Sequence, residues 1–104
     1  MALSPYAPTE LDLMMRSSRL VVSEVEAFHK SLDTFLDNMN IKILSPRPKY
    51  HAQAYALRNT YRQLTYFDSL HASVSIVENV ELLSYDEVYA NIPGLVYKHP
   101  KEYA

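Results

Sequence analysis

The stretch that decides the fold runs from Thr65 to Asp86 and reads TYFDSLHASVSIVENVELLSYD. Its apolar residues Phe67, Leu70 and Val74 recur with the period of a helix, and Val77 continues the same stripe. The run VELLS that follows is short and apolar, which predicts a buried strand. The stretch therefore predicts a helix that starts near residue 67, a turn, and then a strand that ends in an acid.

A second face of this predicted helix carries mostly small residues. Asp68, His71, Ala72 and Ser75 lie on it, next to the apolar stripe. Small side chains let another helix approach closely, because interaxial distance depends on the side chains at the contact. We therefore expect this face to be covered as well.

Two carboxylates stand at the ends of the stretch. Asp68 is placed at the start of the helix, where the dipole favours a negative charge. Asp86 directly follows the strand, and in open α/β sheets ligands collect outside the carboxyl ends of the strands. Both acids are candidate site residues. The alternative for each is purely structural: Asp68 is a helix-start acid, and Asp86 caps a short helix after it.

Composition bounds the class of protein. The chain has 104 residues, of which 48% are hydrophobic, and this predicts one folded domain over residues 1–104. A net charge of −2 neither indicates nor excludes a nucleic-acid partner. With no Cys there is no disulfide framework, which fits a reducing cytoplasm. No apolar run is long enough for a membrane span, and we expect no membrane association.

The remaining elements alternate between helical and extended patterns. The single Gly predicts few left-handed turns and a mostly helical chain. The pattern predicts an α/β fold in which helices flank a small parallel sheet. The expected elements are an extended start at 1–8, helices at 9–16, 21–38 and 50–63, a strand at 41–44, a short helix at 86–90 and an edge strand at 95–97.

Two basic residues, Arg58 and Arg62, lie one turn apart on the helix predicted at 50–63. Their face differs from that of the apolar stripe. Such a pair can contact phosphates, although a solvated face is the more common role of charged residues. We note the pair as a weak candidate for phosphate binding.

The segments Tyr66–Ala72 (YFDSLHA) and Leu82–Asp86 (LLSYD) together resemble the C-terminal half of a PIN domain. PIN domains are small nucleases typified by the VapC-type toxins of toxin–antitoxin pairs. The family pattern is an Asp that opens a helix in the context D-x-x-H-A, a strand ending in Ser or Thr, and a further Asp. Residues Ile92–Pro100 are similar to the closing strand of the family, and the helix that carries Glu10 is similar to its second acidic segment.

The resemblance implies a metal-dependent ribonuclease in which Glu10, Asp68 and Asp86 are the catalytic and metal-binding acids. Carboxylates suit Mg²⁺ or Mn²⁺, and such ions activate water and brace the leaving oxygen of a phosphodiester. Ser84 would then hold a metal-bound water or orient Asp86. Two other acids, Glu24 and Glu26, remain as alternatives to Glu10; we prefer Glu10 because it follows an extended start.

The resemblance does not extend over the whole family fold. A PIN domain opens with a buried strand that carries the first catalytic Asp, followed by a helix. Only nine residues precede Glu10, too few for a strand of about five residues and a helix of about eleven. We therefore expect a PIN-like three-layer fold without its first strand and first helix.

Such a fold would leave apolar surface that another chain covers. The expected partners are RNA, a second copy of the chain, and an antitoxin-like protein. Two functions stay open at this point. One is a PIN-like ribonuclease, whether active or inactive in this short form, and the other is a non-catalytic α/β module for interaction or dimerisation.

Overall fold

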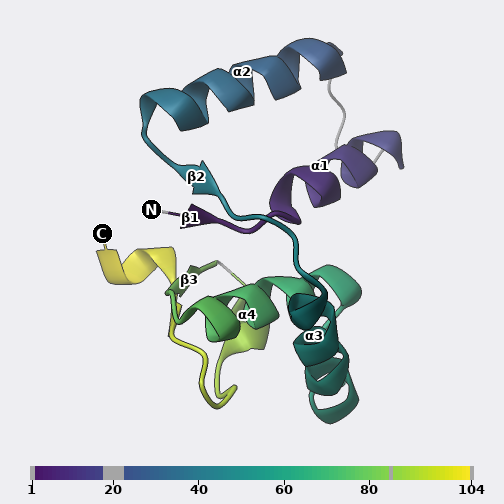
Figure 1. Ribbon diagram of the computed structural model, residues 1–104, viewed down its shortest axis with the longest axis vertical. Coiled ribbons are helices and arrows are strands. Elements are labelled where there is room, and N and C mark those ends of the chain that lie inside the picture. The colour runs from purple at the N-terminus through teal and green to yellow at the C-terminus, as the bar shows by residue number, and fades with distance from the viewer. Residues whose placement is uncertain (1, 18–22, 85, 104) are drawn as a thin grey trace. The chain divides into compact units, whose positions relative to one another are not determined.

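The computed structural model describes residues 2–17, 23–84 and 86–103, and its contacts divide the chain into two compact units, residues 1–46 and 47–104. Each unit combines helices with one pair of parallel strands (Figure 1). The described residues thus form a mixed α/β protein with four α-helices, as the sequence predicts. The described strands form two separate pairs, whereas we expected one sheet.

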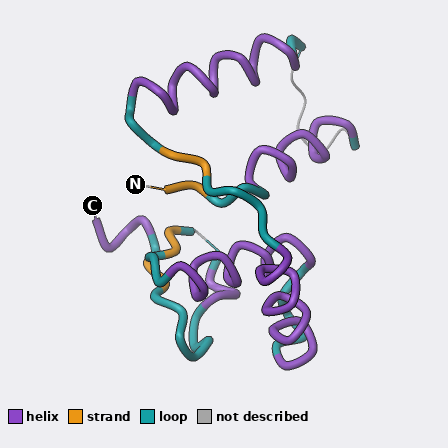
Figure 2. Tube along the Cα trace, viewed as in Figure 1, coloured by secondary structure: helices purple, strands orange, loops and turns teal. Residues whose placement is uncertain are grey.

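The first unit contains strand β1 (Ala2–Leu3), helix α1 (Ala7–Arg16), helix α2 (Val25–Asn38) and strand β2 (Lys42–Ile43). The second unit contains helices α3 (Pro48–Thr60) and α4 (Tyr66–Glu78), strands β3 (Leu82–Leu83) and β4 (Tyr97–Lys98), and two 3-10 helices. These 3-10 helices are η1 (Glu87–Tyr89) and η2 (Pro100–Tyr103). Figure 2 shows how helices predominate and how short the strands are.

In the first unit the extended start is a strand. β1 pairs in parallel with β2, with Ala2 opposite Lys42, and the Leu44 amide donates to the Leu3 carbonyl at 2.9 Å. Parallel pairing was predicted, but β1 itself was not. The side chains of Asp12 on α1 and His29 on α2 join the two helices, with 3.3 Å between carboxylate Oδ1 and ring Nε2.

Helix α2 is shorter and less buried than its sequence pattern suggested. The predicted start at residue 21 lies outside the described residues, and α2 begins at Val25. Leu36 is buried, whereas Val25, Phe35 and Met39 are exposed. The helical period therefore predicted the helix correctly, but its apolar stripe is only partly covered.

In the second unit α3 packs on α4 through small residues. Ala54 on α3 and Ala72 on α4 are fully buried, and the buried Ser73 hydroxyl on α4 donates to the Tyr50 carbonyl at 2.6 Å. Ser69 and Ser75 are buried on the same helix. Of the predicted small-residue face of α4, Ala72 and Ser75 are covered, while Asp68 and His71 are half-buried. It follows that the serine hydroxyls must find partners inside the contact, as that of Ser73 does.

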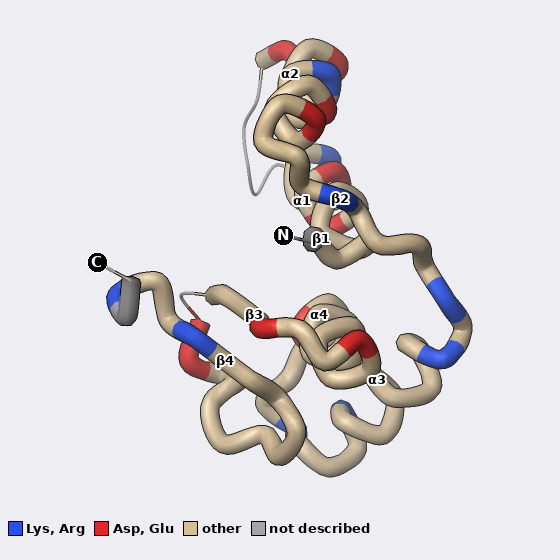
Figure 3. Tube along the Cα trace, turned by 60° about the vertical axis from the view of Figure 1, so that its left-hand side comes forward, with Lys and Arg blue, Asp and Glu red and all other residues tan. Residues whose placement is uncertain are grey.

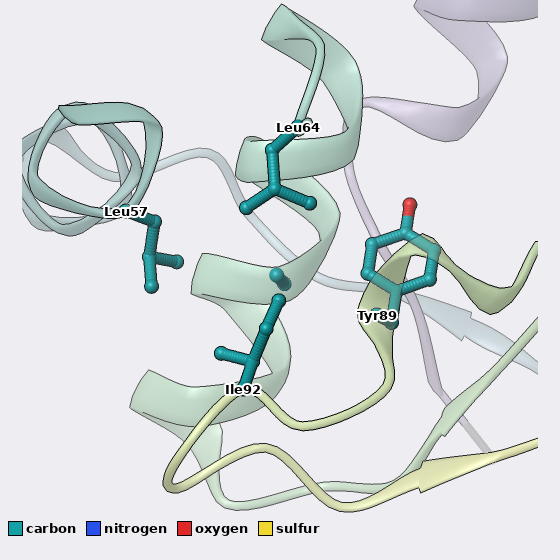
Figure 4. Close-up of a cluster of buried hydrophobic side chains, with 5 residues drawn as sticks. Leu57, Leu64, Tyr89 and Ile92 are labelled. Carbon is teal, nitrogen blue, oxygen red and sulfur yellow. The ribbon is translucent and has the colours of Figure 1, made fainter. Parts of the chain in front are cut away.

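A hydrophobic cluster lies at the centre of this unit. Its buried members are Leu57, Leu64, Ala72, Tyr89 and Ile92. Figure 4 shows side chains from α3, from the link before α4, from η1 and from the following loop converging on α4. The cluster fixes the C-terminal segment against α4 although β3 and β4 have only two residues each.

Local signals fix both ends of α4. Thr65 caps the start in a capping box with Asp68, and Asn79 ends the helix in the left-handed conformation, with φ of 54°. Four described residues have positive φ, namely Asn40, Asn79, Asn91 and Gly94. Three of these left-handed positions are occupied by Asn, which tolerates this region better than other non-Gly residues and here takes the place of Gly.

The strands of the second unit also pair in parallel. Leu82 lies opposite Tyr97 and Leu83 opposite Lys98, and the Leu82 amide donates to the Val96 carbonyl at 2.8 Å. This register holds residues 82–84 next to the C-terminal segment. Among the described residues, none of the helices has the length and apolar character to cross a membrane.

A polar contact joins the start of α3 to the end of α4. The buried Tyr50 hydroxyl donates to Glu78 Oε1 at 2.8 Å, and Arg47 Nη1 lies 3.6 Å from the same oxygen. Burial of the phenol, followed by its hydrogen bond to the carboxylate, raises the pKa of Tyr50 above its ordinary value. The folded protein therefore holds this proton more tightly than the unfolded chain does.

We expect Tyr50→Phe to lower the free energy of unfolding by about 1 kcal/mol at neutral pH, because a buried hydrogen bond is lost and the ring is kept. The difference between wild type and variant should shrink as pH rises above about 10, where the unfolded chain gives up the proton first. Urea unfolding followed by circular dichroism from about pH 8 to about pH 11 would measure it. A difference that stayed constant over this range would contradict the assigned pKa direction.

Candidate carboxylate site

Asp68 lies in the first turn of α4 and is half-buried. Its Oδ2 accepts from the Thr65 amide at 3.1 Å, while the Thr65 hydroxyl oxygen accepts from the Asp68 amide at 3.2 Å. Its Oδ1 accepts from the Tyr89 hydroxyl at 3.2 Å. Asp68 therefore caps the start of α4, which is the structural alternative given for it above. A carboxylate has about four lone-pair sites, so these bonds leave it capacity for a further ligand.

Asp86 is exposed and directly precedes η1. Its Oδ1 accepts from the Val88 amide at 3.0 Å, so it caps this short helix, as its own structural alternative proposed. Its amide donates to the Ser84 hydroxyl oxygen at 3.1 Å. Ser84 is itself held by the Tyr97 hydroxyl, which donates to the Ser84 carbonyl at 3.2 Å. The Ser84 hydroxyl therefore contacts the backbone of Asp86, and the two roles suggested for Ser84 stay predictions.

Tyr89 links the two acids. It is the last residue of η1, which Asp86 caps, and its hydroxyl contacts Asp68. Its ring is buried in the hydrophobic cluster (Figure 4), so the hydroxyl is held at a fixed place. Tyr89 was not among the predicted site residues. The sequence hints at Tyr89 only through its place three positions after the capping acid Asp86. Its hydrogen-bond partner Asp68 is distant in the sequence, so no local pattern relates the two.

Glu10 lies in the first turn of α1 and is half-buried. It belongs to the first unit, whereas Asp68 and Asp86 belong to the second. The alternatives are also in the first unit: Glu24 precedes α2 and is exposed, and Glu26 pairs with Lys30 at 2.7 Å. Within residues 2–17, 23–84 and 86–103, three or more His, Asp or Glu side chains are nowhere grouped so that they could hold a metal ion.

The donors of this site suit a hard divalent cation in chemical type. They are the carboxylates of Asp68 and Asp86 and the hydroxyl of Ser84, and Mg²⁺ and Mn²⁺ prefer oxygen ligands. Mg²⁺ is usually held by one or two carboxylates, with water and substrate phosphates in its other positions. The two acids of the second unit are therefore donors of the type that such an ion takes, with water and phosphate as its further ligands.

The two Arg candidates differ in position. Arg58 is on α3, and its Nη1 donates to the Ser69 hydroxyl oxygen at 2.7 Å. Arg62 is exposed and lies beyond the end of α3 at Thr60, so the prediction of one helix through residue 63 was wrong. The helix ends at Thr60 because the backbone of the next residue, Tyr61, leaves the helical region, with φ −113° and ψ 88°. The pair is thus not presented on one helical face.

We expect Thr65→Ala to lower the free energy of unfolding by about 1 kcal/mol, because the side-chain oxygen that caps α4 is removed. Thr65→Ser keeps that oxygen and should remain close to wild type. Both variants leave the Asp68 carboxylate in place, so they separate the structural role of this helix start from a chemical one. Equal stability of all three proteins in urea unfolding would show that the cap is not formed in solution.

A protein-family model described as PIN domain matches residues 9–95. The match spans both units and includes Glu10, Asp68, Asp86, Ser84 and Tyr89. Neither the curated proteins nor the solved structures gave a significant match to the chain.

Proposed function

This chain belongs to the PIN domain family, and we propose that it is a metal-dependent endoribonuclease of the VapC type. The observation that carries the proposal is the family match over three acids, two of which are joined through Tyr89. PIN domains generally use Mg²⁺ or Mn²⁺ and bind RNA. Because the match continues from one unit into the other, we treat residues 1–104 as one PIN-like domain.

In this proposal Asp68 and Asp86 hold the metal ion, and Glu10 is the third acid. The Tyr89 hydroxyl donates to Asp68 and restricts its rotamer, and Ser84 fixes the turn that carries Asp86. When bound, Mg²⁺ or Mn²⁺ supplies a water of lowered pKa and positive charge at the phosphodiester. Arg62, which is exposed, and the unused N–H groups of Arg58 would contact phosphates.

We expect Asp68→Asn and Asp86→Asn each to weaken Mn²⁺ binding at least tenfold in calorimetric titration, because each removes one charged oxygen donor. Glu10→Gln should weaken it as well if this acid is the third ligand. Asp33→Asn is the matched control, since it makes the same exchange at an exposed position on α2. Unchanged binding in both Asp68→Asn and Asp86→Asn would remove these acids from the proposed site.

We expect cleavage of a labelled single-stranded RNA in Mn²⁺ to be abolished by EDTA and reduced at least a hundredfold in Asp68→Asn. The reason is that EDTA withdraws the proposed ion and Asp68→Asn removes one of its charged oxygen donors, while the apolar side chains of the core stay unchanged. Thr65→Ala should keep the cleavage activity at a temperature where it is folded. Cleavage that persists in EDTA or in Asp68→Asn would assign the activity to a contaminant or to other residues.

A non-catalytic interaction module is the second candidate. The apolar residues Val25 and Phe35 of α2 and Met39 directly after it are exposed, and surface of this kind is typical of a binding face. A second copy of the chain or an antitoxin-like protein would cover it. Light scattering separates the candidates: a dimer without nuclease activity favours the module. The chain has no Cys, which suits a reducing compartment, and we propose a cytoplasmic location for either function.

A further inference from the structure

Tyr66, the first residue of α4, is a large aromatic side chain with 53% of its surface exposed. The guanidinium carbon of Arg58 lies 5.0 Å from the centre of its ring. Phe67 meets the same ring edge-on, with centroids 5.6 Å apart. The ring is thus supported by a cation and by a neighbouring aromatic while it stays accessible to solvent.

Arg58 is itself held in place. Its Nη1 donates to the hydroxyl oxygen of Ser69, which is fully buried, and that hydroxyl donates in turn to the Tyr66 carbonyl at 2.6 Å. Arg58, Ser69 and Tyr66 therefore form a closed contact between α3 and the first turn of α4. This contact reduces the freedom that an exposed Tyr loses when it binds a flat ligand, so the ring is preorganised.

The sequence that leads up to this ring is basic. From residue 47 to residue 67 the chain has four cationic residues and no Asp or Glu; they are Arg47, Lys49, Arg58 and Arg62. Of these, Arg58 contacts the ring, whereas Arg47 lies at the other end of α3 and pairs with Glu78. Figure 3 shows α3 without acidic residues, in contrast to α2. Basic residues combined with exposed aromatic rings are the usual composition of surfaces that bind single-stranded nucleic acid.

We propose that Tyr66, backed by Arg58, is a stacking platform for a nucleobase of single-stranded RNA. The proposal takes its ligand class from the proposed ribonuclease function and adds the place where the strand is gripped. Tyr66 and Asp68 share the first turn of α4, but their partners lie on different elements: Arg58 on α3 and Tyr89 on η1. The platform therefore positions the strand beside the acids and is not part of the reacting group.

The test is binding of a fluorescein-labelled oligouridine, followed by anisotropy in EDTA so that no metal or cleavage is needed. We expect Tyr66→Leu to weaken binding about tenfold, the effect of losing one stacked base, while Tyr66→Phe keeps wild-type affinity. Tyr55→Leu is the matched control, because Tyr55 is also an exposed Tyr of this unit, with 63% of its surface exposed. Thermal unfolding verifies that each variant is folded.

The platform is overturned if wild type does not bind the oligouridine, if Tyr66→Leu binds as wild type does, or if Tyr55→Leu loses as much affinity. The Mn²⁺-dependent cleavage assay distinguishes this result from the nuclease proposal, since strand binding is measured in EDTA, where no metal takes part. If the strand binds through Tyr66 but is not cleaved in Mn²⁺, the stacking proposal stands and the nuclease proposal is rejected. If the strand is cleaved in Mn²⁺ but Tyr66→Leu binds it as wild type does, the nuclease proposal stands and the stacking proposal is rejected.

Discussion

The close contact between α3 and α4 is the constraint on which the second unit depends. Ala54 and Ala72 are fully buried in it, and the buried Ser73 hydroxyl donates to the backbone carbonyl of Tyr50. A buried hydroxyl without a partner would cost on the order of 1–3 kcal/mol, so this bond allows the small polar side chain to stand in the contact. Larger side chains at these places would separate the helices and open the cluster around Leu57 and Ile92.

Because this contact holds α4 in place, it also positions the carboxylates at the two ends of the helix. Glu78 at one end accepts from Tyr50, and Asp68 at the other end accepts from Tyr89. Tyr50 and Tyr89 have the same structural role: the ring of each is buried, and its hydroxyl donates to a carboxylate. The polar ends of α4 are thereby tied to the apolar core, and movement of one would disturb the other.

The two acids of the candidate site have a structural role and a proposed chemical one at the same time. Asp68 caps α4, and Asp86 caps η1. The two roles are compatible because an ionised carboxylate accepts several hydrogen bonds and remains charged. Capping also holds each acid in one rotamer, which favours binding of a metal ion or a phosphate group.

The sequence alone determined the features that depend on neighbours along the chain. Helical period predicted α4, α3 and α2, the small-residue face of α4 predicted its burial, and Asp68 and Asp86 were located at the ends of elements because capping is local. Only the tertiary structure decided the rest. The bonds of Tyr89 to Asp68 and of Arg58 to Ser69 join residues that no periodicity relates, and the partial exposure of α2 depends on which surfaces meet. A pattern fixes which face of an element is apolar, whereas its partner is chosen by the packing of the whole chain.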